Sequence, residues 1–385
     1  MTKSKSQRAS RLFLCLAGIS ALVVVIVYAA EQTAWIALTL AGCLLSLSLA
    51  ASTGQGVFRQ LAFTTWIVTG VAAGMVFHRH LLVFPSPWPL VGGQEMSVVF
   101  IPVLQIIMFA MGTTLSVADF ARVFRMPAGV VIGLACQYTI MPLVGFTLAY
   151  SFPFQPEIAA GLVLVGCSPS GLASNVMAFI ARANVAMSVT LTAFSTLLAP
   201  LLTPHLMKTL AGEMVEINVP AMMWSMTKIV LLPVLAGLVF HHLIYHRLRW
   251  LERVMPLVSM VGILIMTVLT VAVGRDKLIE VGGLLIFACI LHSSAGFGLG
   301  YFACRMLGRD QLTCRTIALE VGLQNSGMAA GLAKELGKVA TLGLVPITFG
   351  PVMNVIASTL ANWWRVHPTE ECKVVEQTRT ARTAG

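Results

Sequence analysis

The sequence predicts an all-α polytopic membrane protein, with two five-helix halves of inverted topology preceded by two extra N-terminal helices. Three observations support this. Of the 385 residues, 57% are hydrophobic and 10% are charged, with a mean hydropathy of +0.87, whereas soluble chains are about 45–50% apolar and about 25% charged. Long apolar runs recur along the chain, and two pairs of short motifs repeat. This composition excludes a soluble enzyme, a disordered protein and a secreted disulfide module.

Apolar runs of bilayer length occur twelve times in the sequence. A spanning helix needs about 20 apolar residues, whereas a β-barrel would need alternating segments of about ten residues. The runs favour helices, and they cover 11–30, 33–51, 61–78, 97–117, 127–150, 157–180, 184–207, 219–242, 254–274, 280–304, 311–334 and 339–364.

The basic residues indicate the orientation of these spans. If the N-terminus is cytoplasmic, 18 Lys and Arg residues fall on the inner side, 6 on the outer side, and Lys228 lies within a span. This bias follows the positive-inside rule. We therefore expect cytoplasmic N- and C-termini in a bacterial inner membrane. We then expect the net charge of +10 to favour contact with anionic lipid of the inner leaflet, and not with nucleic acid.

The ends of the chain lie outside the two halves. The run 11–30 ends near a signal-peptide-like cleavage site, but it is long for a signal sequence, so we expect a retained helix. Segment 1–55 is then an accessory hairpin, and the polar segment 367–385 a disordered cytoplasmic tail. The two halves cover 56–210 and 211–366.

Two motif pairs indicate an internal repeat. The segment 73–78 (AGMVFH) is echoed by 236–241 (AGLVFH), and 170–173 (SGLA) by 326–329 (SGMA). The separations are 163 and 156 residues. Because five spans per half is an odd number, the second half enters the membrane from the opposite side, which is the plan of many secondary transporters. Convergent packing of small residues is the alternative.

The sixth and eleventh spans should be interrupted. Pro169, followed by Ser170 and Gly171, removes a backbone donor in the middle of one span. The segment 322–327 (GLQNSG) places amides and glycines in the middle of the other. Such segments are tolerated in a membrane where they line a cavity or a ligand site. Matching interruptions in two halves therefore predict the substrate site.

Glu320 stands just before the second interruption and is the one acidic residue deep in an apolar span. A charge buried there costs about 2.5–3.5 kcal/mol. Arg315 lies near the inner surface and Lys228 can extend towards the outer one, so a bound cation is the simpler partner. A protonated carboxyl or a structural ion pair stays open. No thiolate or imidazole cluster accompanies Glu320, which favours Na⁺ over a soft metal.

The oxygen atoms that could join Glu320 lie in both halves. The nearest in sequence are Gln324 and the carbonyls of Val321 and Leu323. The first half supplies Gln137, Ser174, Asn175, Ser188 and Thr192.

Five stretches make the sequence resemble the bile acid:sodium symporter family. In family order they are 109–115 (FAMGTTL), 136–142 (CQYTIMP), 171–177 (GLASNVM), 184–192 (NVAMSVTLT) and 320–327 (EVGLQNSG). Together they extend over about 61–364.

The resemblance implies a panel domain and a core domain of ten helices in all, two crossed broken helices and two Na⁺ sites. It assigns to the first site Ser174, Asn175, Ser188, Thr192 and Glu320. It assigns to the second Gln137, Glu320, Val321, Leu323 and Gln324. Asn325, Asn354 and Ser170 would face an organic anion. The resemblance also implies Na⁺ as the coupling ion, and no cofactor is expected.

The sequence departs from the family in two places. The first interruption reads PSGL at 169–172, where many bacterial members have a double glycine followed by threonine. This departure bears on the substrate contacts at Ser170 and Leu172, and not on the sodium ligands. The N-terminal pair of helices also exceeds the usual ten.

Other functions give different expectations. An arsenite-type efflux permease of related architecture would use the thiol of Cys167, which otherwise packs as a small apolar residue. An intramembrane enzyme would need a motif such as H-E-x-x-H or G-x-S-x-G, and the sequence has neither. His242 and His246 have helical spacing but no neighbouring acid. His292 favours an interhelical hydrogen bond over a proton relay.

Overall fold

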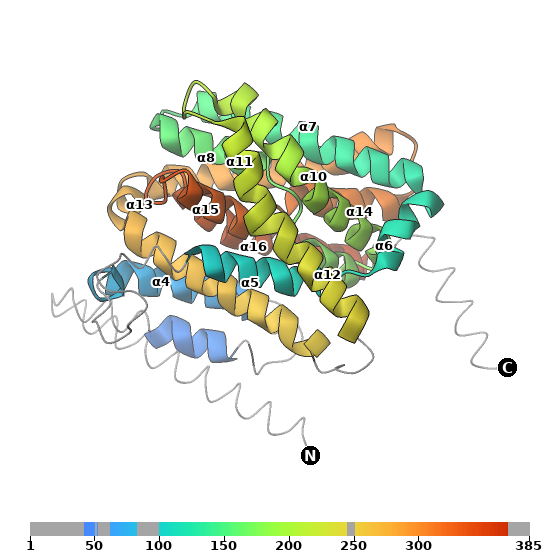
Figure 1. Ribbon diagram of the computed structural model, residues 1–385, viewed down its shortest axis with the longest axis horizontal. Coiled ribbons are helices and arrows are strands. Elements are labelled where there is room, and N and C mark those ends of the chain that lie inside the picture. Colours follow the sequence, from blue (N-terminus) through green and yellow to red (C-terminus); the bar gives the residue numbers. More distant parts are fainter. Residues whose placement is uncertain (1–41, 51, 53–61, 83–99, 245–250, 369–385) are drawn as a thin grey trace, which may run out of the picture.

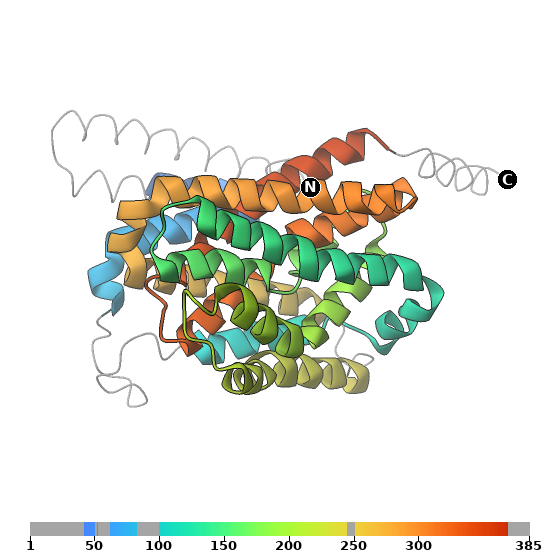
Figure 2. The same ribbon diagram turned by 90° about the horizontal axis from the view of Figure 1, so that it is seen from above.

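The computed structural model describes residues 42–50, 52, 62–82, 100–244 and 251–368, and the elements within these ranges are helices. In chain order they are α4 (Ala62–Leu82), α5 (Phe100–Gly112), α6 (Val117–Ala121), α7 (Pro127–Ser151), α8 (Pro156–Gly166), α9 (Ala173–Ile180), α10 (Val185–Ala211), α11 (Val219–Met226), α12 (Leu232–Ile244), α13 (Leu251–Met306), α14 (Gln311–Gly322), α15 (Ser326–Glu335) and α16 (Leu344–Val366). Figures 1 and 2 show them packed in several layers. The expected span 11–30 lies outside the described residues.

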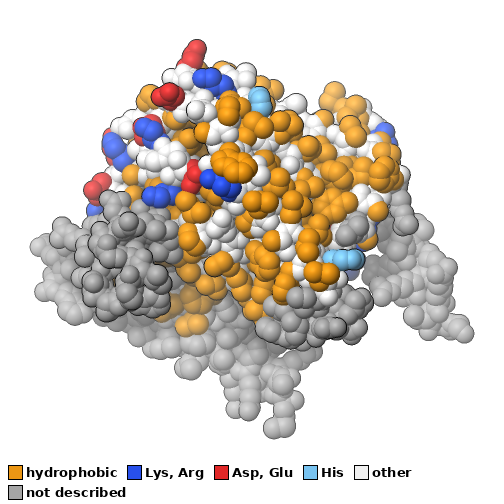
Figure 3. Space-filling model, in the orientation of Figure 1, with side chains coloured by type: hydrophobic (Ala, Val, Ile, Leu, Met, Phe, Trp, Pro, Cys, Tyr) orange, Lys and Arg blue, Asp and Glu red, His pale blue; other side chains and the backbone are white. Residues whose placement is uncertain are grey.

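Five helical stretches in the described part are long and apolar enough to cross a membrane. They are Pro127–Ser151, Val185–Ala211, Val219–Leu243, Leu257–Met306 and Leu344–Val366. On the face shown in Figure 3, hydrophobic side chains spread over the surface while many charged ones gather towards one end. Such a surface is stable in lipid and not in water. The chain is therefore a multi-pass membrane protein.

The two predicted interruptions are present. α8 ends at Gly166 and α9 begins at Ala173, so the predicted span 157–180 is two half-helices. In the same way α14 ends at Gly322 and α15 begins at Ser326. Pro169 and the glycines of both segments explain why neither span is a continuous helix.

The two predicted spans 254–274 and 280–304 are both helical, but residues 275–279, predicted as a loop between them, are helical as well. The structure assigns one helix, α13, through residues 275–279. That segment reads RDKLI and contains neither glycine nor proline, so nothing in it ends a helix. The part of α13 before residue 275 packs on α4 and α5, and the later part packs on α7 and α14. These two parts lie in different layers (Figure 2) and take the places of the two predicted spans.

Another unpredicted element is a five-residue π-helix, Thr227–Leu231, between α11 and α12. It lies within the predicted span 219–242. Lys228 lies in this π-helix, its side chain is exposed, and its ammonium sits 5.7 Å from the ring centre of Trp224. An ammonium over an indole ring is a favourable cation–π contact.

Glycines permit the closest helix crossings. A methyl group on Gly237 of α12 would overlap the carbonyl oxygen of Phe109 in α5, and one on Gly112 would overlap that of Val234. A methyl group on Gly74 of α4 would lie 2.7 Å from the carbonyl oxygen of Val268 in α13. The repeated motifs thus place Gly74 and Gly237 at close crossings, where the lack of a side chain lets backbones approach.

Part of the accessory N-terminal segment 1–55 is described. Residues 42–50 are helical and pack against α4, where the hydroxyls of Ser48 and Thr69 lie 2.7 Å apart. Trp66 donates from Nε1 to Ser52 Oγ at 2.8 Å. The second accessory span, 33–51, is therefore helical over its described portion.

Candidate functional site

The two interruptions cross and bond to each other. Ser170 and Gln324 form an antiparallel β-bridge. The amide of Gly171 donates to the carbonyl of Leu323 at 2.9 Å, and the amide of Asn325 donates to the carbonyl of Pro169 at 2.8 Å. Breaking the helices frees these backbone groups, and the crossing satisfies them without water.

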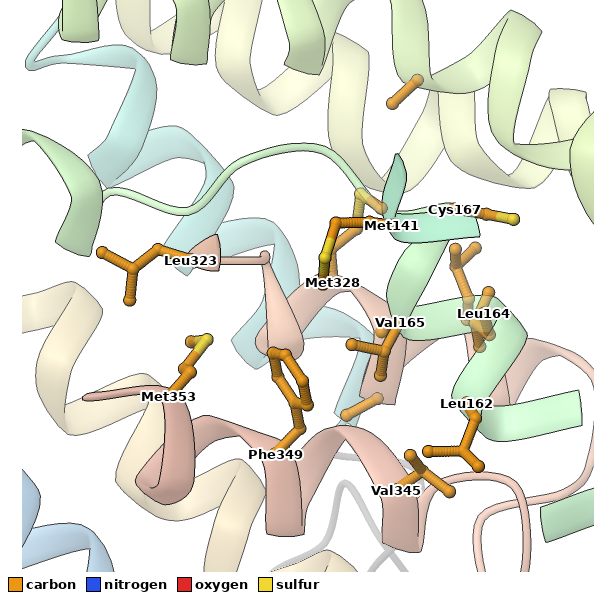
Figure 4. Close-up of a cluster of buried hydrophobic side chains, with 14 of the residues drawn as sticks. Met141, Leu162, Leu164, Val165, Cys167, Leu323, Met328, Val345, Phe349 and Met353 are labelled. Atoms are coloured by element: carbon orange, nitrogen blue, oxygen red, sulfur yellow. The ribbon is translucent and has the colours of Figure 1, made fainter. Parts of the chain in front are cut away.

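This crossing needs a small residue. A methyl group on Gly171 would lie 2.9 Å from the carbonyl oxygen of Gln324, tighter than ordinary packing allows. Apolar side chains surround the crossing: Figure 4 shows Met141, Leu164, Met328 and Phe349 packed beside the half-helices. The backbone of the crossing is therefore closely packed inside an apolar core.

Glu320, in the last turn of α14, directs its carboxylate at α10. The side chain is 2% exposed. Ser188 donates from Oγ to Glu320 Oε1, and Thr192 donates from Oγ1 to Glu320 Oε2 at 3.0 Å. Ser188 and Thr192 are four residues apart on α10, so both hydroxyls lie on one face of that helix.

The oxygen atoms around Glu320 outnumber the protons available to them. Ser188 Oγ also lies 2.8 Å from Asn175 Oδ1. Thr192 Oγ1 also lies 3.4 Å from Asn175 Oδ1 and 3.2 Å from Ser174 Oγ. Each hydroxyl carries one proton, and that of Ser174 is directed to the carbonyl of Gly171 at 2.9 Å. Several lone pairs therefore converge with no proton between them, an arrangement that a small hard cation stabilises.

The basic residues considered as partners of Glu320 lie elsewhere. Arg315 donates to the carbonyls of Trp364 and His367 at 3.2 and 2.8 Å, and its guanidinium lies 5.4 Å from the Trp364 ring centre. Lys228 lies over Trp224. Among the ion pairs between described residues, none includes Glu320.

A second group of polar atoms is formed by Gln137 and Gln324. Gln137 of α7 donates from Nε2 to the carbonyl of Ser168 at 2.9 Å and to Gln324 Oε1 at 2.8 Å. Gln324 donates from Nε2 to the carbonyl of Val321 at 2.5 Å. Gln137 Oε1 is buried without a hydrogen-bond partner. A buried acceptor left unpaired costs about 1–3 kcal/mol, and a cation would satisfy it.

The structure thus brings together most of the residues that the resemblance assigned to the ion sites. Ser174, Asn175, Ser188, Thr192 and Glu320 form one connected cluster. Gln137, Val321 and Gln324 form another. The carbonyl of Leu323 instead accepts from Gly171 and, at 3.3 Å, from Ser170 Oγ. No hydrogen bond between described residues joins Glu320 to Gln137 or Gln324.

The three residues expected at the substrate lie in different settings. Asn325 caps α15, its Oδ1 accepting from the Met328 amide at 3.0 Å. Asn354 of α16 donates to the carbonyl of Gly350 at 2.8 Å, and its Oδ1 is buried without a hydrogen-bond partner. The hydroxyl of Ser170 donates to Ser174 Oγ at 3.3 Å, so Ser170 contacts the oxygen cluster around Glu320.

The residues considered for the alternative functions make packing contacts or hydrogen bonds within the protein. Cys167 is fully buried beside Leu164 and Met141 (Figure 4). His292 bonds through Nε2 to the carbonyl of Met141 at 3.1 Å, which is the interhelical bond favoured above. Within the described residues, no group of three His, Cys, Asp or Glu side chains is placed to hold a metal. His246 lies outside the described residues.

Sequence reasoning missed two backbone carbonyl groups of the site. The carbonyls of Ser168 and Gly171 accept hydrogen bonds from Gln137 and Ser174. Both residues lie in the first interruption, so the unwound backbone was the available signal. Which carbonyls face the cluster depends on the path of the chain through the break.

Comparisons with known proteins find relatives among sodium-dependent transporters. The sequence model of the Sodium Bile acid symporter family matches residues 101–281. An uncharacterized sodium-dependent transporter of Bacillus subtilis, YocS, is 41% identical over 262 residues, which cover 68% of this chain and 81% of YocS.

More distant relatives come from plants and mammals. The probable sodium/metabolite cotransporter BASS1 of Arabidopsis thaliana chloroplasts is 34% identical, over 79% of this chain and 73% of its own. The ileal sodium/bile acid cotransporter of Cricetulus griseus is 30% identical, over 69% and 77%. The chain therefore belongs to the sodium bile acid symporter family, whose members are sodium-dependent transporters and not enzymes.

Proposed function

We propose that this chain is a secondary active transporter that carries an organic anion, bile acid-like or a small carboxylate, together with Na⁺. The observation that carries the proposal is the proton-poor oxygen cluster around Glu320, built from α9, α10 and α14. Half-helix ends and unwound carbonyls are the groups that coordinate coupling ions in such transporters.

Two Na⁺ positions follow from the two oxygen groups. One ion would be held by Glu320 with Ser174, Asn175, Ser188 and Thr192. The other would be held near Gln137 Oε1, Gln324 and the carbonyl of Val321. For this second ion also to contact Glu320 and the Leu323 carbonyl, small rearrangements would be required, because those oxygens accept hydrogen bonds from other groups in this structure.

The anion would bind where the N-terminus of α15 meets α16. A helix N-terminus carries partial positive charge and exposed amides that suit a carboxylate. Asn325 caps that terminus, and a methyl group on Gly350 of α16 would lie 3.0 Å from Ser326 Oγ. Asn354 follows Gly350 by one turn, and its unpaired Oδ1 is free to receive a donor or a bridging water.

The motion would be alternating access by two inverted repeats. The contacts between the halves support this: Gly74 of the first half lies against Val268 of the second, and Gly237 of the second half lies against Gly112 of the first. The core domain, which contains the crossing and has helices from both repeats, would rock against the panel domain of α4, α5, α12 and the first part of α13. Two Na⁺ with one monoanion carry one net charge inward, which gains about 2.3 kcal/mol per 100 mV.

Uptake by purified protein in liposomes tests the proposal. A bile acid, a 2-oxo acid and pantoate are each offered with an inward Na⁺ gradient or an equal K⁺ gradient. We expect uptake of at least one anion in Na⁺ only, and its loss in Glu320→Gln. Equal uptake in Na⁺ and K⁺ would contradict Na⁺ coupling.

An arsenite efflux function has weaker support, because Cys167 is fully buried among apolar side chains. A cell strain lacking its own arsenite pump should stay sensitive to arsenite when it expresses this chain.

A further inference from the structure

The helices α7 and α10, which carry residues of the two proposed Na⁺ positions, pack closely against each other (Figure 1). A methyl group on Gly133 of α7 would lie 2.6 Å from the Leu191 side chain of α10, and one on Gly129 would lie 3.0 Å from that of Met187. The contacts advance along both helices in the same direction, so α7 and α10 are parallel in this region. Small residues on α7 let the two helices approach.

Tyr138 adds a directional contact to this packing. Its Oη donates to the backbone carbonyl of Ser195 at 2.6 Å, and its side chain is buried. The bond lies about one turn beyond Gly133 on α7 and one turn beyond Leu191 on α10, so it continues the same alignment. A buried tyrosine hydroxyl usually finds a partner, and here the partner is the main chain of a neighbouring helix. The bond therefore resists sliding of α10 along α7.

α10 is weakened internally where Tyr138 holds it. Pro200 has no N–H, so the carbonyl of Thr196 lacks its usual helix donor. Ser195 donates from Oγ to the carbonyl of Thr192 at 3.1 Å, and Thr196 donates from Oγ1 to the same carbonyl at 2.8 Å. Hydroxyls bonded in this way bend helices. A hydrogen bond from outside can therefore set the position of this segment.

The two ends of this connection lie beside different proposed ion positions. On α7, Tyr138 follows Gln137, whose Oε1 is buried without a hydrogen-bond partner. On α10, Thr192 lies one turn before Ser195 and donates to Glu320 Oε2 at 3.0 Å. The hydrogen bond from Tyr138 thus joins the helix that carries Gln137 to the helix that holds Glu320.

We propose that Tyr138 is a positioning residue that couples the two Na⁺ positions. This rests on the proposed transport function. An ion that attracts Gln137 Oε1 displaces that part of α7, and the Tyr138 hydroxyl then carries the Ser195 segment of α10 with it, which places Thr192 for the ion at Glu320. Packed side chains and hydrogen bonds carry such coupling. It is reciprocal, so an ion at Glu320 favours the second ion equally.

Tyr138→Phe tests the proposal because it removes the hydroxyl and keeps the ring. Ser195 lies inside α10, so its carbonyl keeps a helix donor and the variant should fold. Binding of radioactive Na⁺ is measured on purified protein in detergent, with unlabelled Na⁺ as competitor at constant ionic strength. We expect the half-saturating Na⁺ concentration to rise by about threefold or more and the binding curve to become less steep.

Tyr150→Phe is the matched control on the same helix. Tyr150 donates to Glu213 Oε2 at 3.4 Å at an exposed position. It should bind Na⁺ like the unaltered protein.

The same change in a Gln137→Met background separates coupling from a merely structural role. That background lacks the second ion position, so the Tyr138 hydroxyl has nothing to transmit. There we expect Tyr138→Phe to change the half-saturating concentration by less than about twofold, because coupled residues are not additive. If Gln137→Met does not fold, Gln324→Met removes the same position.

Equal fold-changes in the two backgrounds would overturn the proposal, and so would a Tyr138→Phe variant that binds Na⁺ like the unaltered protein. Either result leaves the transport function intact. Absence of Na⁺ binding by the unaltered protein would instead contradict the transport function, and the coupling with it.

Discussion

Ser170 and Gln324 lie side by side as an antiparallel bridge, although they are 154 positions apart in the chain. Each lies in a segment where a membrane helix is interrupted. Their pairing places Gln137, Ser174 and Glu320 around one crossing. Backbone groups of the crossing bond to each other, which leaves the surrounding side-chain oxygens for the proposed Na⁺ ions.

Gln137 should be needed for the second ion position. Gln137→Met removes the unpaired Oε1 and also the donor to the Ser168 carbonyl. We expect Na⁺-dependent uptake to be lost and the protein to be destabilised by about 1–3 kcal/mol, as measured by uptake and thermal unfolding.

The matched control for this change is Gln105→Met. Gln105 donates to the Lys228 carbonyl at 3.4 Å, away from the crossing. It should retain uptake, and equal loss in both variants would argue against a specific role for Gln137.

Gly166 should be intolerant of any side chain. A methyl group there would overlap the carbonyl oxygen of Met141, which belongs to the backbone and cannot easily move. Gly166→Ala should lower the stability by about 1–3 kcal/mol. Gly283→Ala is the control, because nothing lies within 4 Å of that position in α13. It should be neutral or stabilising by about 0.5–1 kcal/mol, and thermal unfolding compares the two.

Gly337 tests backbone conformation alone. It has a φ of +69° after the end of α15, and nothing lies within 4 Å of a methyl group placed on it. Gly337→Ala should cost about 1–2 kcal/mol, because an L-residue disfavours that region. Gly298 lies inside α13 and also has nothing within 4 Å of an added methyl group, so Gly298→Ala should not carry this stability cost. A stable Gly337→Ala variant would show that this turn is free to change conformation.

Cys167 should be dispensable for transport. Its side chain packs among apolar residues (Figure 4). Cys167→Ala should keep Na⁺-driven uptake within about twofold, with a small loss of stability from the lost packing. If Cys167→Ala abolished uptake without unfolding the protein, a thiol-based mechanism would regain support.

The sequence predicted the two interruptions because proline, glycine and amide residues are costly inside a lipid-exposed helix. It also identified Glu320 through its isolation in an apolar span. It did not predict the continuity of α13, because residues 275–279 are polar but helix-forming. Nor did it predict the π-helix Thr227–Leu231, for which the residues give no signal.

The contacts within the site also lay beyond sequence reasoning. That Ser188 reaches both Glu320 and Asn175 depends on how α9, α10 and α14 meet in space. The Leu323 carbonyl accepts hydrogen bonds from Gly171 and Ser170 because of the path that the unwound segment takes. Neither set of contacts can be predicted from the spacing of these residues along the chain.

The thermal stability of the purified protein in Na⁺ and in K⁺, with Glu320→Gln beside it, tests the central claim most directly. A ligand at 100 times its Kd stabilises a protein by about 2.7 kcal/mol. We expect Na⁺ to raise the melting temperature of the unaltered protein, in a concentration-dependent manner and at constant ionic strength, and to have no such effect on Glu320→Gln. Equal melting temperatures in Na⁺ and K⁺, or an unchanged Na⁺ effect in Glu320→Gln, would contradict the account.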